Sequence, residues 1–265
     1  MGKPILRWVI GKTSQLGYDV LAFSIKQFYK IYKNKFDYYL LYNNSNVQIL
    51  REIIGSYNIN LIKQDWNFNP LDLNYFNDSS FWKIIPARIN INEYEIFVDN
   101  DIVPLKYFEK IDVFLKSNKV LLTKDCLKYQ GNYKNLFEEN EYYNAGFFGL
   151  PPNYDFQKEL KKTWFENNCL STFDNGDEQG LTTATLKKQD KIIIDSEENL
   201  MIFPEGKVKS NFYNSNTNKN NFILEDFNIF DKKHYFFHFV TINKTTKNKY
   251  WDIFKNNFLK RIKNL

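Results

Sequence analysis

Two aspartates that follow a strand-like run form the segment best suited to chemistry. Residues 95–98 read Glu-Ile-Phe-Val, and Asp99, Asn100 and Asp101 follow directly. Carboxylates at positions i and i+2 of a turn can both reach one hard cation, which keeps open positions for the phosphates of a substrate. Turns are also rich in Asp and Asn for structural reasons, so an Asp-x-Asp alone is a weak signal. Here the preceding strand reads as buried, which favours a ligand-binding position.

The elements that must position this pair follow the pattern of an α/β domain. In the first half of the chain, apolar strand-like runs alternate with amphipathic segments. This pattern predicts strands at residues 5–10, 36–42, 59–62 and 94–98, and helices at residues 18–32, 47–57 and 80–89. The strand ends at residues 10, 42 and 98 then share the carboxyl edge of a mainly parallel sheet, where ligands bind in open α/β folds.

The second half of the sequence is less regular. It predicts strands at residues 120–123 and 146–150, helices at residues 154–166 and 179–186, and a loop rich in Asn, Ser and Lys at residues 209–221. An amphipathic helix is predicted at about residues 250–263, with Trp251, Phe254, Phe258 and Ile262 on one face. We interpret that face as docking onto the core, with contact to a membrane surface as the alternative.

The composition indicates one domain spanning residues 1–265. With 43% hydrophobic and 18% aromatic residues, the chain can close one sizeable core. It contains no uninterrupted apolar run of about 18 residues and no signal-peptide pattern at its start, so we expect a cytoplasmic protein, peripheral at the inner membrane face if the last helix binds it. Cys126 and Cys169 are expected to be ordinary thiols. The net charge of +5 suits a phosphate site without requiring one.

Cations and small residues lie near the predicted ligand edge. Lys83 and Arg88 precede the Asp-x-Asp strand, where added positive charge would help to hold a diphosphate. The loop Gly11-Lys12-Thr13 follows the first strand and could turn over a nucleotide or be a plain connection. It is not a P-loop, because the position that requires the first glycine is Leu6.

His234 and His238 are the only histidines, so a histidine metal ligand must be one of them. The aromatic and β-branched residues 235–240 predict a strand, and no H-E-x-x-H motif is present. His238 lies inside this apolar run and is the candidate third ligand beside Asp99 and Asp101. A buried structural histidine is the alternative.

Four segments in order resemble the retaining glycosyltransferases of the glycogenin and bacterial lipooligosaccharide galactosyltransferase family (glycosyltransferase family eight), within the GT-A superfamily. The resemblance covers about residues 5–250. The segments are the helix at residues 81–88, Asp99-Asn100-Asp101, Asn144-Ala145-Gly146, and Asp177-Glu178-Gln179, followed by His238. The resemblance implies a GT-A fold, an α/β architecture with a mainly parallel central sheet. At the end of the first strand, where the family usually has an acidic residue near the base, this chain has Ile10-Gly11 instead.

The same resemblance implies a metal-dependent hexosyltransferase-like enzyme. It would move a sugar from a nucleotide-diphosphate sugar, expected to be a UDP-sugar, to a glycan or lipid-linked acceptor in polysaccharide biosynthesis, with retention of configuration. Asp99, Asp101 and His238 would then hold Mn²⁺ or Mg²⁺. Taken together, the resemblance and the residues themselves give as donor-binding candidates Gly11, Lys12, Thr13, Lys83, Arg88, Asn100, Asn144, Ala145, Gly146, Lys244 and Lys247.

The catalytic candidates are Asp177, Glu178 and Gln179. In a retaining enzyme they would position the donor sugar or stabilise an oxocarbenium-like centre. In an inverting enzyme Asp177 or Glu178 would instead be the base that activates the acceptor.

Two other functions fit parts of the sequence. A sugar-1-phosphate nucleotidyltransferase uses a related sheet and metal, but residues 10–17 lack its Gly-rich basic loop. A noncatalytic carbohydrate- or nucleic-acid-binding module would use the 18 Tyr and 25 Phe residues for stacking. Most of these aromatics fall at core spacing, and no RNP-like or zinc-knuckle signature is present, so we expect no nucleic-acid partner.

Overall fold

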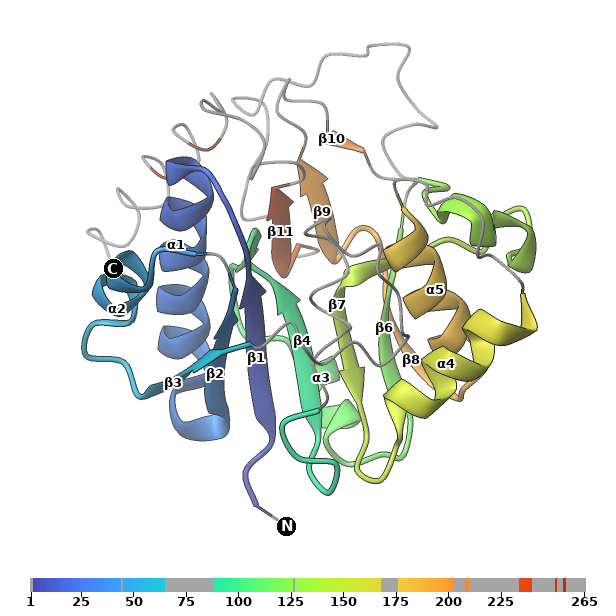
Figure 1. The fold of residues 1–265 in the computed structure, drawn as a ribbon, viewed down its shortest axis with the longest axis horizontal. Helices are drawn as coiled ribbons and strands as arrows, with labels where there is room; N and C mark the ends of the chain where they lie inside the picture. The colour runs from blue at the N-terminus through green and yellow to red at the C-terminus, as the bar shows by residue number, and fades with distance from the viewer. Residues whose placement is uncertain are drawn as a thin grey trace.

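The computed structural model describes residues 2–43, 45–64, 88–125, 127–167, 176–202, 208–209, 234–239, 251 and 255. A seven-stranded sheet forms the centre of this part of the chain (Figure 1). Its strands are β1 (Ile5–Ile10), β2 (Asp37–Tyr42), β3 (Ile59–Lys63), β4 (Glu95–Asp99), β6 (Val120–Lys124), β7 (Tyr143–Leu150) and β8 (Lys191–Ile194).

The strand order in this sheet is β3-β2-β1-β4-β7-β6-β8. β7 runs antiparallel to both of its neighbours, and the other neighbouring strands are parallel. Ile10 lies beside Tyr42, and Val9 lies beside Asp99. The mainly parallel sheet and the shared carboxyl edge of β1, β2 and β4 are therefore confirmed.

Five α-helices occur in the described residues: α1 (Gln15–Tyr32), α2 (Val47–Ile54), α3 (Lys110–Phe114), α4 (Phe156–Glu166) and α5 (Asp177–Leu186). In Figure 1, α1 and α2 lie toward the β3 end of the sheet, and α4 and α5 toward the β8 end. α1 begins three residues before its predicted start because Ser14 caps it, its side chain accepting a hydrogen bond from Gly17 N at 3.1 Å. α2 ends early because Gly55 follows it with a φ of 51°, which favours glycine.

A second sheet, which the sequence did not predict as a unit, covers the carboxyl edge. It has the order β10-β9-β11-β5, with β5 (Ile102–Pro104), β9 (Asn199–Ile202), β10 (Val208–Lys209) and β11 (Phe236–Phe239). β9 and β11 lie above β1 and β4 in Figure 1. β11 confirms the strand predicted around His238. Lys209, expected in a loop, instead ends β10, and residues 210–221 of that loop lie outside the described residues.

Several other predictions fall on parts of the chain that the structure does not describe. They include Cys126, Cys169 and residues 80–87 of the predicted helix at 80–89. The last residues of that prediction, Arg88 and Ile89, are described and are not helical.

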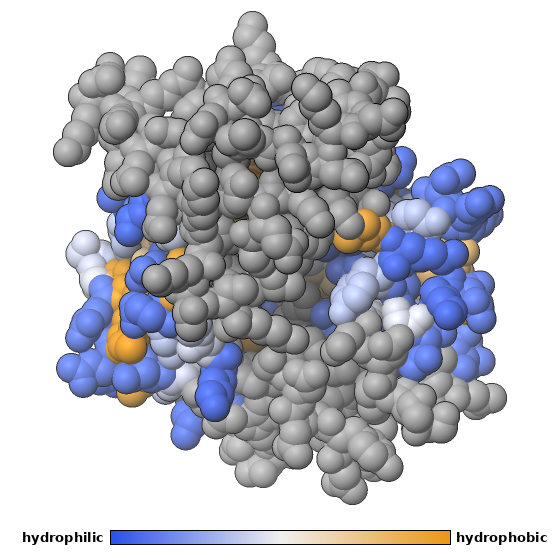
Figure 2. Space-filling model, turned by 90° about the horizontal axis from the view of Figure 1, so that it is seen from above, coloured by the Kyte–Doolittle hydropathy of each residue, from blue (hydrophilic) through white to orange (hydrophobic). Residues whose placement is uncertain are grey.

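Trp251 is the described residue that tests the apolar face of the predicted last helix. It is helical and 1% exposed, and its ring packs edge-on against Phe23 of α1 and Phe239 of β11 at centroid distances of 5.4 and 5.2 Å. At this residue the face docks onto the core. No described helix is long and apolar enough to cross a membrane. Seen from above, the described surface is mainly hydrophilic, with small hydrophobic areas (Figure 2).

Candidate metal centre and donor site

Asp99 ends β4, and Asp101 lies in the turn that leads directly into β5. β11 pairs with β5 in antiparallel register, so that His238 lies opposite Ile102. The backbone N–H of Phe239 donates to the carbonyl oxygen of Asp101 at 2.9 Å. This strand pairing brings a histidine from near the end of the chain to the Asp-x-Asp turn.

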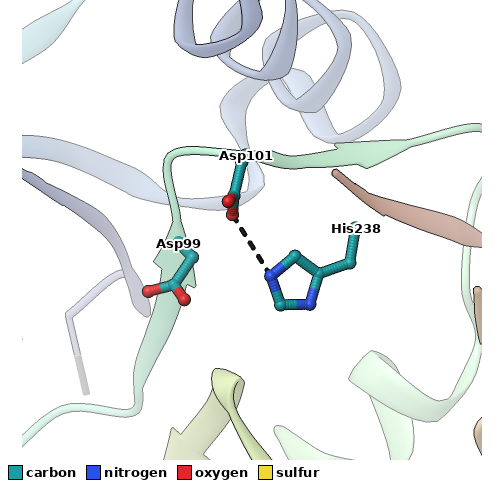
Figure 3. Close-up of side chains that lie close together, drawn as sticks. All are labelled: Asp99, Asp101 and His238. Atoms are coloured by element: carbon teal, nitrogen blue, oxygen red, sulfur yellow. Dashed lines mark ion pairs between the residues drawn. The ribbon is translucent and has the colours of Figure 1, made fainter. Parts of the chain in front are cut away.

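The side chains of Asp99, Asp101 and His238 converge from these two strands (Figure 3). One ligand atom from each lies within 4.8 Å of the others, and we call these three residues the cation site. His238 Nε2 lies 3.3 Å from Asp101 Oδ1. Among the described residues, this buried oxygen accepts no hydrogen bond. Two carboxylates and an imidazole are a donor set that suits Mn²⁺ or Mg²⁺, so the residues fit the expected metal.

Gly146 on β7 borders the cation site. A Cβ atom at this position would lie 2.9 Å from both Asp99 Oδ2 and His238 Cε1, and 2.7 Å from Asn144 Oδ1. Real Cβ atoms essentially never show contacts below 3.0 Å. A larger residue in place of the glycine of the Asn144-Ala145-Gly146 segment would therefore displace the side chain of Asp99, His238 or Asn144.

The Asn144 segment is also bonded to α5. Asn144 Nδ2 donates to Gln179 Oε1 at 3.2 Å, and the backbone N–H of Ala145 donates to the same oxygen at 3.5 Å. The backbone N–H of Gly146 donates to Asn144 Oδ1 at 2.7 Å. Three of the four segments singled out in the sequence thus meet in one place.

Asp177 and Glu178 lie at the start of α5, and both are buried. Asp177 accepts from the backbone N–H of Asn132 at 2.6 Å and from Asn132 Nδ2 at 3.0 Å. It thereby fastens α5 to the 3₁₀-helix Gly131–Leu136, which gives this carboxylate a structural function. Glu178, the next residue of α5, is 6% exposed.

The loop after β1 lies at the same edge of the sheet as Asp99. Lys12 is exposed, and Gly11 and Thr13 are half-buried. Ser45 Oγ donates to the carbonyl oxygen of Gly11 at 2.6 Å, and Asn43 N donates to that of Ile10 at 3.0 Å. The loops after β1 and β2 are therefore joined beside the cation site. Asn100, which is 7% exposed, lies within the Asp-x-Asp turn itself.

Arg88 lies at the other edge of the sheet, contrary to the expectation that it helps to hold the donor. Its Nε lies 3.5 Å from Glu95 Oε2 at the beginning of β4, whereas Asp99 ends that strand. Its Nη1 donates to the carbonyl oxygens of Pro151 and Tyr154 at 2.7 and 3.0 Å. These contacts correct the assignment of Arg88 to the donor site. They hold its guanidinium at the end of β4 that is opposite to Asp99, where it has a structural function. Lys83, Lys244 and Lys247 lie outside the described residues.

Asp125 is a residue that the sequence reasoning missed. It is 2% exposed, follows β6, and accepts hydrogen bonds from both Asn144 and Gln179. Its signal in the sequence was a carboxylate directly after the predicted strand at residues 120–123 and Lys124. β7 runs opposite to β6, so the end of β6 meets the start of β7, where Asn144 lies.

Comparisons with known proteins give matches to solved structures. No family model matches the sequence, and no curated protein matches it. The galactosyltransferase LgtC in complex with donor and acceptor sugar analogs is 12% identical with a TM-score of 0.61, covering 98% of this chain and 96% of that chain. The bifunctional glycosyltransferase WbbM (18%, 0.61) covers 98% of this chain and 49% of that chain. Mouse xyloside xylosyltransferase 1 (10%, 0.56) covers 92% and 99%. At these identities the likeness shows the fold, and the chain has the GT-A fold of these glycosyltransferases.

Proposed function

We propose that the chain is a metal-dependent glycosyltransferase that moves a sugar from a nucleotide-diphosphate sugar, a UDP-sugar, to a glycan or lipid-linked acceptor. The observation that carries this proposal is the convergence of Asp99, Asp101 and His238 within 4.8 Å at the carboxyl edge of a GT-A sheet. The structural neighbours are glycosyltransferases, which supports the same reaction class.

Asp99, Asp101 and His238 hold Mn²⁺ or Mg²⁺ in this proposal. When bound, the cation neutralises the donor diphosphate and stabilises the negative charge that develops on the leaving nucleoside diphosphate. Asp99 ends β4, Asp101 lies in the turn before β5, and His238 comes from β11, whose register with β5 places it next to that turn. Gly146 supports this role, because its missing side chain leaves the approach to the ligands open.

The remaining donor contacts are assigned from their position at the same edge. The loop Gly11-Lys12-Thr13 faces the nucleotide, with Lys12 as its exposed cation. Asn144, Ala145 and Gly146 line the space for the sugar, and a glycine there lets a ring approach the backbone. Lys83, Lys244 and Lys247 stay predictions for the additional positive charge. We propose no membrane contact, since Trp251 is buried.

Glu178 is the carboxylate of α5 that we assign to the donor sugar. The side chain of Asp177 is bonded to Asn132, and that of Gln179 to Asn144 and Asp125. In this proposal Glu178 positions the sugar or stabilises its positive charge in a reaction that retains configuration. The acceptor hydroxyl then attacks from the face that the leaving group vacates.

The first experiment screens nucleotide sugars with Mn²⁺ for a rise in melting temperature, because a ligand that binds only the folded state stabilises it. The donor found in this way is then tested for release of its nucleoside diphosphate. A noncatalytic binding module would be stabilised by a sugar ligand and release none.

The metal assignment is tested by chelation and by substitution. Excess chelator should abolish turnover and Mn²⁺ should restore it. Asp99→Asn and Asp101→Asn should each leave the fold intact and lower turnover by about 10²-fold or more, the scale of losing a preorganised electrostatic element. Asp190→Asn is the matched control, because Asp190 is exposed and lies just before β8. Full turnover in chelator, or wild-type turnover in an Asp99 or Asp101 variant, would refute the corresponding assignment.

A further inference from the structure

Asp125 holds two side-chain amides next to the cation site. Its Oδ2 accepts from Gln179 Nε2 at 3.1 Å and from Asn144 Nδ2 at 3.3 Å. Its Oδ1 accepts from the backbone N–H of Leu127 at 2.9 Å. Both oxygens of this buried carboxylate are therefore engaged by N–H groups.

The orientation of the Gln179 amide follows from groups whose polarity is fixed. Its Nε2 donates to Asp125 Oδ2 and to the backbone carbonyl of Tyr129 at 3.0 Å. Its Oε1 accepts from Asn144 Nδ2 and from the backbone N–H of Ala145. A backbone carbonyl can only accept and a backbone N–H can only donate. If the Gln179 amide were reversed, its oxygen would face the carbonyl of Tyr129 and its NH₂ group would face the N–H of Ala145.

The orientation of Asn144 is linked to the same carboxylate. Its Nδ2 faces Asp125 Oδ2, and its Oδ1 accepts from the backbone N–H of Gly146 at 2.7 Å. A Cβ built on Gly146 would lie 2.7 Å from that Oδ1 and 2.9 Å from Asp99 Oδ2 and His238 Cε1. The carbonyl oxygen of Asn144, and not its NH₂ group, therefore borders the cation site.

We propose that Asp125 is a positioning residue, which acts with the backbone groups of Tyr129, Ala145 and Gly146 to hold both amides so that Asn144 presents its carbonyl oxygen beside the cation site. An oxygen at this place attracts a cation or a donor hydroxyl, whereas an NH₂ group repels a cation. The consequence for catalysis rests on the proposed function. The orientation of the amides does not.

Asp125→Asn is the sharpest perturbation, because it keeps the shape of the side chain and changes one oxygen into NH₂. That NH₂ must face either the N–H of Leu127 or the NH₂ groups of Asn144 and Gln179. Each choice places one hydrogen-bond donor against another. Reversing the amide of Asn144 would place its NH₂ group against the N–H of Gly146, and reversing that of Gln179 would place its oxygen against the carbonyl of Tyr129.

The first test uses the protein without metal or donor. Side-chain ¹H–¹⁵N signals are assigned from those lost in Asn144→Ala and Gln179→Ala. In the wild-type protein both NH₂ groups should exchange with solvent at least about 10-fold more slowly than that of the exposed Asn92, because they are buried and bonded. In Asp125→Asn their signals should shift and the exchange should accelerate, whereas Asp190→Asn should change neither.

Fast exchange of these groups in the wild-type protein overturns the proposal, even if Asp125→Asn does not fold. Unchanged signals in a folded Asp125→Asn protein overturn it as well. Neither readout needs an active enzyme, so a failure of the glycosyltransferase assignment would be recognised separately, by the absence of turnover with every donor tested.

The second test separates positioning from stability. The kcat of Asp125→Asn is measured well below its melting temperature, so that all molecules are folded. Positioning predicts a kcat about 10- to 100-fold below wild type, the usual effect of removing a group that orients residues at a metal site. A lowered melting temperature with unchanged kcat would show a purely structural role and overturn the proposal.

Discussion

Replacing Gly146 with alanine adds a single methyl group beside the cation site. The new Cβ would lie 2.9 Å from Asp99 Oδ2 and from His238 Cε1, and 2.7 Å from Asn144 Oδ1. Ordinary van der Waals contact begins at 3.4 Å, so the two ligands are half an ångström too close. Gly146 lies at a register shift of β7 against β6 and just beyond the last residue that pairs with β4, so this stretch of backbone or the ligand side chains must move.

The expected effect on metal binding is larger than the effect on stability. Overpacking a core by one methyl group costs about 1–3 kcal/mol of unfolding free energy. A metal site tolerates ligand displacements of only about 0.2 Å, which is well below the required shift. We therefore expect Mn²⁺ affinity and turnover to fall by about 10- to 100-fold.

Gly149→Ala is the matched control on the same strand. Its Cβ would lie 2.7 Å from Phe114 Cζ and 3.1 Å from Leu121 Cβ, so it meets the core and not the cation site. Both variants should lose stability in urea unfolding, but only Gly146→Ala should lose Mn²⁺ affinity, measured by electron paramagnetic resonance of free Mn²⁺. Equal Mn²⁺ affinity of Gly146→Ala and wild type would refute the placement of the metal.

Three further predictions concern stability, acid and stereochemistry. The fully buried Arg7 Nε lies 3.0 Å from Glu95 Oε1. Glu95→Gln should lower the free energy of unfolding, measured in urea, by about 3–5 kcal/mol, because it leaves this buried cation opposite a neutral group. Burial raises the pKa of Glu141, but the hydrogen bond and charge of Lys187 outweigh it and hold that pKa below its usual 4.5. The pair thus stabilises the fold above this pH and the contribution is lost on acidification, so Lys187→Met should flatten the fall in unfolding free energy below about pH 4.5. The transferred sugar should keep the α-configuration of its donor in the anomeric proton coupling, and Glu178→Gln should reduce transfer without abolishing it, whereas a β-linked product would show inversion.

The parallel part of the sheet could be predicted from the sequence because of how its strands are buried. β1, β2 and β4 are largely buried, so each consists mainly of apolar and aromatic residues, and β4 ends in Asp99. The carboxyl ends of the three strands meet at one edge in any parallel arrangement. The position of Asp99 and Asp101 at a ligand edge followed from this without knowledge of the remaining fold.

The short strands could not be predicted, because partners distant in the sequence determine them. β5 has three residues and β9 has four, too few for a periodicity to be visible. Each is a strand because β11 pairs with it, and β11 comes from the end of the described chain.

The structural contacts of two charged residues differ from their predicted functions, again because partners distant in the sequence determine them. Arg88 and Asp177 were recognised as groups that could bind a donor, but residue type does not determine the partner. In the structure Arg88 pairs with Glu95 and donates to two backbone carbonyls, and Asp177 accepts hydrogen bonds from Asn132. Asp125 shows the reverse case, since its function became visible only when β7 was found antiparallel to β6.

For His238, one part of its position could be predicted from the sequence and another part depends on a distant partner. The sequence predicted that His238 would lie near the two aspartates because it lies inside an apolar strand, but nothing in the strand pattern indicated which strand would pair with it. The register with β5 supplies the answer, since His238 opposes Ile102, the residue directly after Asp101. Moving that register by one residue would turn the imidazole to the opposite face of β11. The cation site therefore depends on the backbone pairing of β5 and β11 as much as on its three side chains. If the site binds Mn²⁺ as proposed, a substitution that shifts this pairing should weaken Mn²⁺ binding without changing Asp99, Asp101 or His238.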